Sequence, residues 1–157
     1  MKLIAVLFFA LLAYLQASDH YWSSEELDCI KELKLQNDKV GAISQPWGKP
    51  IATNNKALND YFVCYWQKVG MLGNDGKIKW NKFKTHITNE LINITVKEET
   101  NLDTKLHLGI VTYVGQIVKD SLEKCHKQNI LGNTPGQTID KVLNCLGNET
   151  REKLKTL

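Results

Sequence analysis

The chain has 157 residues, with 20 basic and 17 acidic side chains and a formal net charge of +3 at pH 7. A charge this small does not indicate nucleic acid or another polyanion as the main partner. The length suits one domain that buries roughly two-thirds of its unfolded surface. These numbers predict a single core-forming domain. Its fold class has to be inferred from the order of the elements along the chain.

The first 17 residues have the composition of a secretory signal peptide. Lys2 precedes an apolar run that ends at Leu15, and the small residue Ala17 follows. A charged start, an apolar stretch and a small residue at the cut are typical of a leader removed on secretion. A membrane anchor is disfavoured, because a span needs about 20 apolar residues. We therefore expect a signal peptide over 1–17, one secreted, extracellular domain over 18–157, and no membrane insertion.

The first predicted helix covers residues 24–35. Ser23 begins a Ser-Ser-Glu-Glu capping box. Its hydroxyl can accept from the backbone amide of the third helical residue, while the Glu26 carboxylate accepts from the Ser23 amide. Apolar residues then recur with helical spacing. The next segment, 37–53, contains four glycine and proline residues, and this density predicts a loop or a short helical turn.

A second, longer helix is predicted from Asn55. Its apolar positions recur every three or four residues as far as Leu72, with Cys64 at the edge of that face. Glycines near its end and the sequence Gly-Asn-Asp-Gly over 73–76 predict a turn, since Gly76 can supply a positive φ.

Three further helical segments follow. Apolar residues over 80–94 mark the third helix and those over 102–125 mark the fourth. Residues 109–118 are rich in β-branched side chains and leave a strand as the alternative there, but the stripe keeps its helical phase. Thr134 as a cap and Pro135 as the first helical residue indicate the fifth. The whole pattern predicts an all-α bundle of five to six helices.

Four cysteines lie on or beside four of these helices. In a secreted chain an even number is most simply two disulfides, and three pairings are possible. Zinc is disfavoured because cysteine ligands usually occur in close pairs, whereas the nearest two here are about twenty positions apart. The cysteines are Cys29, Cys64, Cys125 and Cys145.

Other patterns do not indicate catalysis. The histidines are scattered and no serine lies in a GxSxG elbow, so we expect neither an enzyme nor a cofactor or metal site. A calcium loop aligned on Gly76 would place Met71, Gly73 and Lys82 at ligand positions, and none of them supplies a carboxylate. Two Asn-x-Thr patterns predict glycosylation once the chain is secreted; their acceptors are Asn93 and Asn148.

Four lysines alternate with apolar residues after the turn. Close charges of this kind can contact a sulfate or phosphate polyanion, although a solvated face whose lysine stems cover apolar neighbours is the more common outcome. They are Lys77, Lys79, Lys82 and Lys84.

Cys64 is followed by a Lys-x-Gly, an apolar pair and an Asp-Gly turn, in the stretch YWQKVGMLGNDGKI. This resembles the insect odorant-binding protein family, the pheromone and general odorant binders, after the third of their six cysteines. The residues that carry the resemblance are Cys64, Lys68, Gly70, Met71, Leu72 and Gly76. The family's second and fifth cysteines form one bridge and correspond here to Asp60 and Gly136. The chain is thus similar to the four-cysteine, C-minus type, which implies that Cys29 pairs with Cys64 and Cys125 with Cys145.

The resemblance implies a carrier that transports a small hydrophobic ligand, such as an odorant, a pheromone or a lipid-like molecule. It also implies a monomer or weak homodimer, with a membrane receptor reached through the ligand. An alternative is a salivary or venom protein of the same fold that sequesters host mediators or binds polyanions.

The ligand site is predicted from the apolar faces themselves. The segment between Cys64 and Cys125 is longer than the family usually has, so family pocket residues do not transfer. Crossing helices can enclose an apolar cavity that binds ligands by desolvation, but the same residues could pack on each other, and periodicity does not separate these outcomes. The residues expected to line such a cavity are Phe62, Tyr65, Met71, Phe83, Ile87, Leu91, Ile110, Val114 and Ile117.

Overall fold

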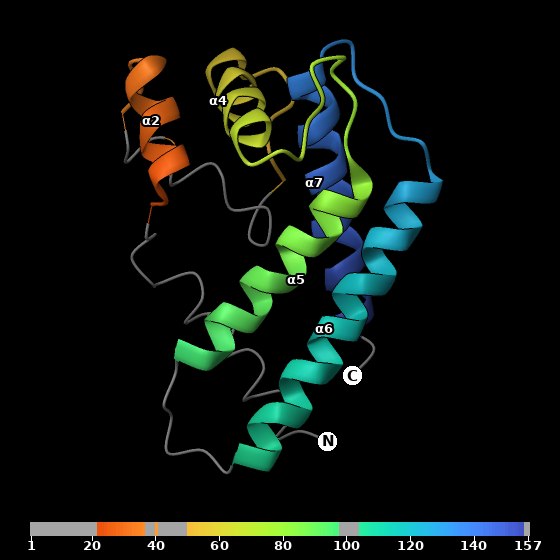
Figure 1. Cartoon of the computed structure of the whole chain (residues 1–157). Coiled ribbons are helices and arrows are strands. Elements are labelled where there is room, and N and C mark those ends of the chain that lie inside the picture. Colours follow the sequence, from red (N-terminus) through yellow and green to blue (C-terminus); the bar gives the residue numbers. More distant parts are fainter. Residues whose placement is uncertain (1–21, 37–39, 41–49, 98–103, 156–157) are drawn as a thin grey trace.

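The computed structural model shows an all-α protein. It describes residues 22–36, 40, 50–97 and 104–155, and for 90–97, 104–108, 110 and 111 it describes the backbone alone. The signal peptide predicted over 1–17 and most of the loop predicted over 37–53 lie outside these residues. The described helices are α2 (Ser24–Glu32), α4 (Lys56–Lys68), α5 (Trp80–Lys97), α6 (Thr104–Lys127) and α7 (Pro135–Lys155) (Figure 1). The predicted fold class is confirmed.

Side chains cap the helix starts as predicted. Ser23 Oγ accepts from the Glu26 amide at 3.2 Å, and the Ser23 amide donates to Glu26 Oε2 at 2.8 Å, which completes the capping box at α2. At α7, Thr134 Oγ1 accepts from the Gln137 amide at 3.2 Å. Pro135 is the first residue of that helix, where its missing amide costs no hydrogen bond.

The end of α2 differs from the prediction. The helix ends at Glu32 rather than at residue 35. Lys34 takes a φ of +53°, and the Leu35 amide reaches back to the Ile30 carbonyl at 2.9 Å. This left-handed cap satisfies the last carbonyls of the helix and turns the chain away. The predicted helix was too long because Leu33 keeps the apolar spacing of the helix.

The turn after α4 is the predicted one, but it begins earlier. α4 ends at Lys68, and Gly70 and Gly76 both take a φ of +75°, a conformation that glycine adopts without steric cost. Leu72, which the spacing assigned to the helix, instead forms an isolated antiparallel bridge with Ile78 across the turn. The assignment of Leu72 was wrong because the positive φ of Gly70 ends the helix first.

Residues 109–118 are helical within α6, so the helix prediction is confirmed there and the strand alternative is wrong. Gly109 and Gly115 have open space where a Cβ would lie, which shows that no close packing requires glycine at these positions. Within the described part of the chain, no helix has the length and apolar character needed to cross a membrane.

The most extensive helix contacts are those of α2 with α4, α4 with α7, α7 with α6, and α6 with α5. α5 crosses in front of α7 in the view shown (Figure 1) and also contacts α4 through Trp66 and Phe83. A Cys29–Cys64 disulfide joins α2 to α4, and a Cys125–Cys145 disulfide joins α6 to α7. This is the pairing that the resemblance implies, and it uses all four cysteines.

The core is built from α4, α6, α7 and the start of α5. Its largest fully buried side chains include Tyr61, Phe83 and Ile139. The segment before α4 is tied to this core by Asn144 of α7, whose Oδ1 accepts from the Ile51 amide at 2.6 Å and whose Nδ2 donates to the Ile51 carbonyl at 2.8 Å. One side chain therefore satisfies both backbone groups of a buried loop residue.

Candidate ligand-binding site

An aromatic cluster joins α4, α5 and α6. The ring centroids of Trp66 and Phe83 are 4.6 Å apart, and those of Trp80 and Phe83 are 5.8 Å apart. Trp80 also stacks on His126 near the end of α6, at a centroid distance of 4.4 Å. Because Trp66 and Phe83 are buried, this cluster holds the start of α5 firmly on the core.

A second set of rings runs along α4. Tyr61 is buried, and its hydroxyl donates to Glu26 Oε1 of α2 at 3.0 Å. Burial, and then the neighbouring Glu26 charge, raise the pKa of Tyr61 far above its ordinary value, so the phenol stays protonated. Its ring stacks on Tyr65, one turn further along, with centroids 6.2 Å apart. The Tyr65 hydroxyl in turn lies 3.2 Å from His86 Nε2 of α5.

The structure places the nine predicted ligand residues in three groups. Two of them, Leu91 and Ile110, have side chains outside the described residues. Four are buried, namely Phe62, Met71, Phe83 and Ile117. The remaining three pack against the core but stay partly exposed, and they come from three helices: Tyr65 of α4, Ile87 of α5 and Val114 of α6. Among the seven members of the set whose side chains are described, these three keep surface that the core does not cover.

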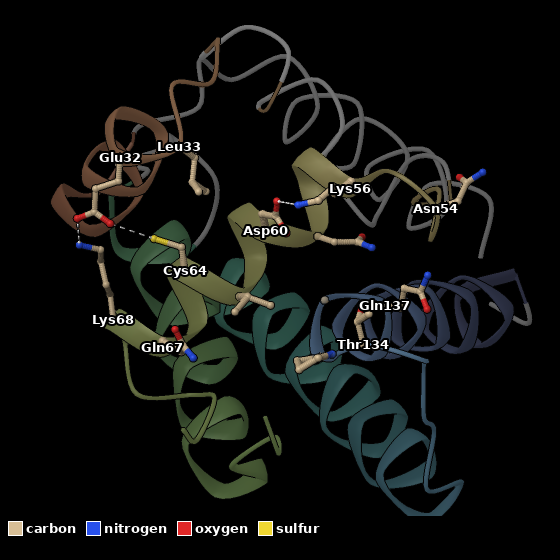
Figure 2. Close-up of a pocket in the computed structure, with 14 residues that line it drawn as sticks. Glu32, Leu33, Asn54, Lys56, Asp60, Cys64, Gln67, Lys68, Thr134 and Gln137 are labelled. Carbon is tan, nitrogen blue, oxygen red and sulfur yellow. Dashed lines mark hydrogen bonds and ion pairs between the residues drawn. The ribbon is translucent and has the colours of Figure 1, made fainter. Parts of the chain in front are cut away.

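An open groove of about 850 Å³ lies elsewhere, between the end of α2, the outer face of α4 and the start of α7 (Figure 2). Ion pairs line it, between Lys68 and Glu32 at 2.7 Å and between Lys56 and Asp60. The hydrogen bond that Lys68 donates to Glu32 raises the pKa of Lys68 above its ordinary value. No described member of the predicted ligand set lines this groove. Apolar atoms contribute the larger part of its surface, but most of the lining residues are polar or charged, and an apolar ligand would remove the two ion pairs from water.

The bridge that the family has and this chain lacks would lie at this groove. Asp60 and Gly136, the two positions without cysteine, both line it. At Gly136, a Cβ would lie 2.6 Å from the Cβ of Asn59 and 2.7 Å from its carbonyl oxygen. The helices α4 and α7 therefore touch through a glycine, at a distance that leaves no room for a side chain.

One group of potential metal ligands occurs among the described side chains. Sulfur and oxygen atoms of Cys29, Glu32 and Cys64 lie within 4.8 Å of one another. Both sulfurs belong to the disulfide, and only a thiolate is a useful metal ligand. This group is therefore not a metal site while the bridge is intact.

The lysine cluster is partly neutralised. Lys77 lies 3.8 Å from the Asp75 carboxylate, and Lys84 forms an ion pair with Glu123 of α6. The hydrogen bond from Lys84 lowers the pKa of Glu123 below its ordinary value. The other two lysines of the cluster are exposed, so the positive face is weaker than the sequence alone suggests.

The two glycosylation acceptors both fall on helices. Asn93 belongs to α5, but its side chain lies outside the described residues. Asn148 is exposed on α7, whereas Thr150, the hydroxyl residue of the same pattern, is only 4% exposed. In the folded protein the acceptor Asn148 is therefore accessible, but the threonine of its glycosylation pattern is buried.

His86 lies half-buried at the edge of the core, three positions after Phe83 on the same face of α5. One buried side chain was missed by the sequence reasoning. Asp140 of α7 is fully buried, and neither carboxylate oxygen has a hydrogen-bond partner. Burial raises its pKa to about 7. Asp140 lies one helical turn from both Gly136 and Asn144, so the spacing places these three residues on one face of α7.

The comparisons with known proteins agree with this architecture. The sequence model of the PBP/GOBP family matches residues 22–149, which is most of the chain. Comparison with curated proteins and with solved structures finds no match. The proteins of this family bind small ligands and are not enzymes. The chain belongs to the PBP/GOBP family, and its two disulfides among four cysteines fit the C-minus type.

Proposed function

We propose that the protein is a secreted carrier that binds a small hydrophobic molecule against α4, α5 and α6 and releases it chemically unchanged. Membership of the PBP/GOBP family supports the binding role. One observation supports the location. Tyr65, Ile87 and Val114 come from three different helices, pack against the core and still keep part of their surface exposed. A ligand that covered this exposed apolar surface would gain free energy by removing it from water.

The energetics favour an apolar ligand of moderate size. Burial of ten methylene groups gains roughly 8 kcal/mol by transfer from water. After the cost of immobilising the ligand, we expect affinities in the micromolar range. The groove beside α2 is the weaker candidate, because an apolar ligand would desolvate the Lys68–Glu32 and Lys56–Asp60 pairs without replacing their contacts.

Displacement of a fluorescent apolar probe tests the proposal. Recombinant residues 18–157 would be titrated with the probe, which would then be displaced by long-chain alcohols, esters and fatty acids. Replacement Ile87→Asp should weaken binding at least tenfold, because a carboxylate at an apolar contact must be desolvated. Leu131→Asp is the matched control, since Leu131 is 68% exposed in the segment before α7 and belongs to no predicted ligand contact.

Two results would count against the carrier role. The first is the absence of binding of every probe and ligand below about 100 μM. The second is equal loss of affinity in the Ile87 and Leu131 variants, which would place the binding surface elsewhere. Mass spectrometry of molecules that co-purify with protein from its native fluid would identify the ligand directly.

Secretion and its consequences belong to the same proposal. Cleavage after Ala17 would give a mature protein that begins at Ser18, and N-terminal sequencing of the protein from its native fluid tests this. The same material shows whether Asn93 and Asn148 carry glycans. A monomer or weak homodimer, and a membrane receptor reached through the ligand, remain predictions. The polyanion alternative has less support, because two of its four lysines have acidic neighbours.

A further inference from the structure

The disulfide between α2 and α4 has a carboxylate beside it. Glu32 Oε2 lies 3.7 Å from the sulfur of Cys64 (Figure 2). The sulfur of Cys29 completes a group of three atoms that all lie within 4.8 Å of one another. Cys29 and Glu32 are three positions apart at the end of α2, so they share one face of that helix. Two helices therefore bring two sulfurs and one carboxylate oxygen together.

These distances suit a tetrahedral zinc ion once the sulfurs are thiolates. Zinc binds thiolate sulfur at about 2.3 Å and carboxylate oxygen at about 2.0–2.2 Å, so two such ligands lie about 3.6 Å apart across the tetrahedral angle. The 3.7 Å between Cys64 Sγ and Glu32 Oε2 is close to this spacing. Because only a thiolate is a useful metal ligand, the disulfide has to be reduced before the group can bind zinc.

The other oxygen of Glu32 is held by Lys68. The lysine donates to Glu32 Oε1 at 2.7 Å, while Oε2 faces Cys64, as Figure 2 shows. An outer partner of this kind fixes the orientation of a metal-binding carboxylate. The three residues also line the open groove, and the Glu32 side chain is 58% exposed. A reductant, a metal ion and water can therefore reach the group from solvent.

We propose that reduction converts the Cys29–Cys64 bridge into a zinc site whose protein ligands are the two thiolates and the Glu32 carboxylate, with water as the fourth ligand. In the first step a small dithiol gives two electrons and two protons to the bridge. The protein S–S bond breaks, two thiols form, and the dithiol closes into its own disulfide. In the second step Zn²⁺ releases the two thiol protons and forms two Zn–S bonds. This inference does not depend on the carrier function.

The second disulfide provides a comparison within the same molecule. Cys125 and Cys145 have Cα atoms 6.0 Å apart, against 5.9 Å in the bridge between α2 and α4. Gln128 follows Cys125 by three positions, and its Oε1 lies 3.6 Å from the sulfur of Cys145. The geometry is thus similar, but an amide oxygen is uncharged and is not among the usual zinc ligands. Of the two reduced bridges, we expect only the one beside Glu32 to bind zinc tightly.

The experiment measures zinc binding by the reduced chain. Recombinant residues 18–157 would be reduced with dithiothreitol, separated from the reagent without oxygen, and titrated with Zn²⁺ against a chromophoric chelator. We expect one tightly bound ion per chain in reduced wild type and none in the oxidised protein. Glu32→Gln should weaken binding by about tenfold or more, because the third protein ligand loses its charge. Co²⁺ used in place of Zn²⁺ should show thiolate charge-transfer absorption and the visible bands of a tetrahedral ion.

Two further variants separate metal ligation from folding. Lys68→Met breaks the ion pair with Glu32 but keeps the carboxylate, so it should bind zinc within about threefold of wild type. Gln128→Glu places a carboxylate beside the second bridge and should add a second tightly bound ion. Circular dichroism with and without Zn²⁺ follows the folded fraction of each reduced variant. A variant that unfolds on reduction is compared through the Zn²⁺ concentration that refolds it, since metal binding free energy then appears as folding free energy.

Several outcomes would overturn the zinc site. Reduced wild type that binds no ion tightly would exclude it directly. Equal affinity in wild type and Glu32→Gln would show that the carboxylate is not a ligand, and equal losses in Glu32→Gln and Lys68→Met would assign the effect to the ion pair. The absence of a second ion in Gln128→Glu would contradict the geometric argument that a carboxylate at this spacing completes the site.

Discussion

At the scale of single residues, Gly136 shows how the chain manages without the third family bridge. A Cβ at this position would lie 2.6 Å from the Cβ of Asn59 and 2.7 Å from its carbonyl oxygen. We predict that Gly136→Ala destabilises the protein by about 1–3 kcal/mol, because the overpacking exceeds the gain of under 1 kcal/mol in helix propensity. Urea unfolding followed by circular dichroism measures the difference.

Gly115 provides the control for this substitution. It lies inside α6, and no neighbouring atom comes within 4 Å of the place that a Cβ would take, so Gly115→Ala should stabilise the protein by about 0.5–1 kcal/mol. If both alanine variants change the free energy of unfolding in the same direction, the close contact between Gly136 and Asn59 does not constrain the position.

Asp140 makes stability depend on pH. Its pKa is about 7 in the folded protein because of burial, and about 3.9 in an unfolded chain. The folded state therefore holds the proton more tightly. This contribution to the free energy of unfolding is fully present below about pH 4, falls as pH rises, and is lost above about pH 7.

We predict that Asp140→Asn and wild type have similar stability near pH 4, whereas the variant is more stable by about 2–4 kcal/mol near pH 8. The amide imitates the neutral acid, which has the same shape and also lacks partners. Urea unfolding of both proteins at the two pH values gives the comparison. A stability difference that is equal at both pH values would mean that Asp140 does not titrate in this interval.

At the scale of elements, sequence patterns predicted helix starts better than helix ends. The starts of α2 and α7 depend on caps whose residue types are distinctive, Ser23 with Glu26 and Thr134 with Pro135. The end of α2 depends on a positive φ at Lys34, a residue type that rarely adopts it. Since the apolar spacing continued as far as the C-cap Leu33, it did not mark the end of the helix at Glu32.

The cap of α2 provides the prediction at this scale. Lys34 is exposed and takes a φ of +53°, which costs an L-residue roughly 1 kcal/mol that glycine avoids. Lys34→Gly should therefore raise the free energy of unfolding by up to about 1 kcal/mol. Lys31→Gly, in the last turn of the same helix, should lower it by about the same amount. Thermal unfolding of the two variants measures these opposite shifts, and destabilisation by both would contradict the role of the cap.

At the scale of the whole molecule, different kinds of contact join the helices. A disulfide joins α2 to α4, close packing at Gly136 joins α4 to α7, and a second disulfide joins α7 to α6. The ion pair of Lys84 with Glu123 joins α5 to α6. The contact between α4 and α7, where the family has its third bridge, depends on packing instead of a disulfide.

The site was less predictable than the fold for a physical reason. Helical spacing shows which face of a helix is buried, but it does not show whether a neighbour or a ligand covers that face. Phe62, Met71 and Phe83 are covered by other side chains, whereas Tyr65 and Val114 on neighbouring faces remain partly exposed. Only the crossing of α4, α5 and α6 separates these outcomes, and that crossing depends on contacts between residues far apart in the chain.

The two disulfides should contribute similarly to stability but differently to binding. Their loops are 35 and 20 residues long, and loop-closure entropy gives about 3–4 kcal/mol for each. Replacing either pair by alanine should therefore lower the free energy of unfolding by a comparable amount. The helices that each bridge holds are not equivalent, because α2 carries none of the predicted ligand residues and α6 carries three.

We therefore predict that, at low temperature and with both variants folded, Cys29→Ala with Cys64→Ala keeps probe affinity within about twofold of wild type. Cys125→Ala with Cys145→Ala should weaken it more, because α6 then loses its covalent link to α7 and keeps packing and the ion pairs Lys124–Glu149 and Lys153–Asp120. Probe titration at matched folded fractions, checked by circular dichroism, separates affinity from stability. Equal losses of affinity in the two variants would show that α2 is as necessary to the ligand site as α6.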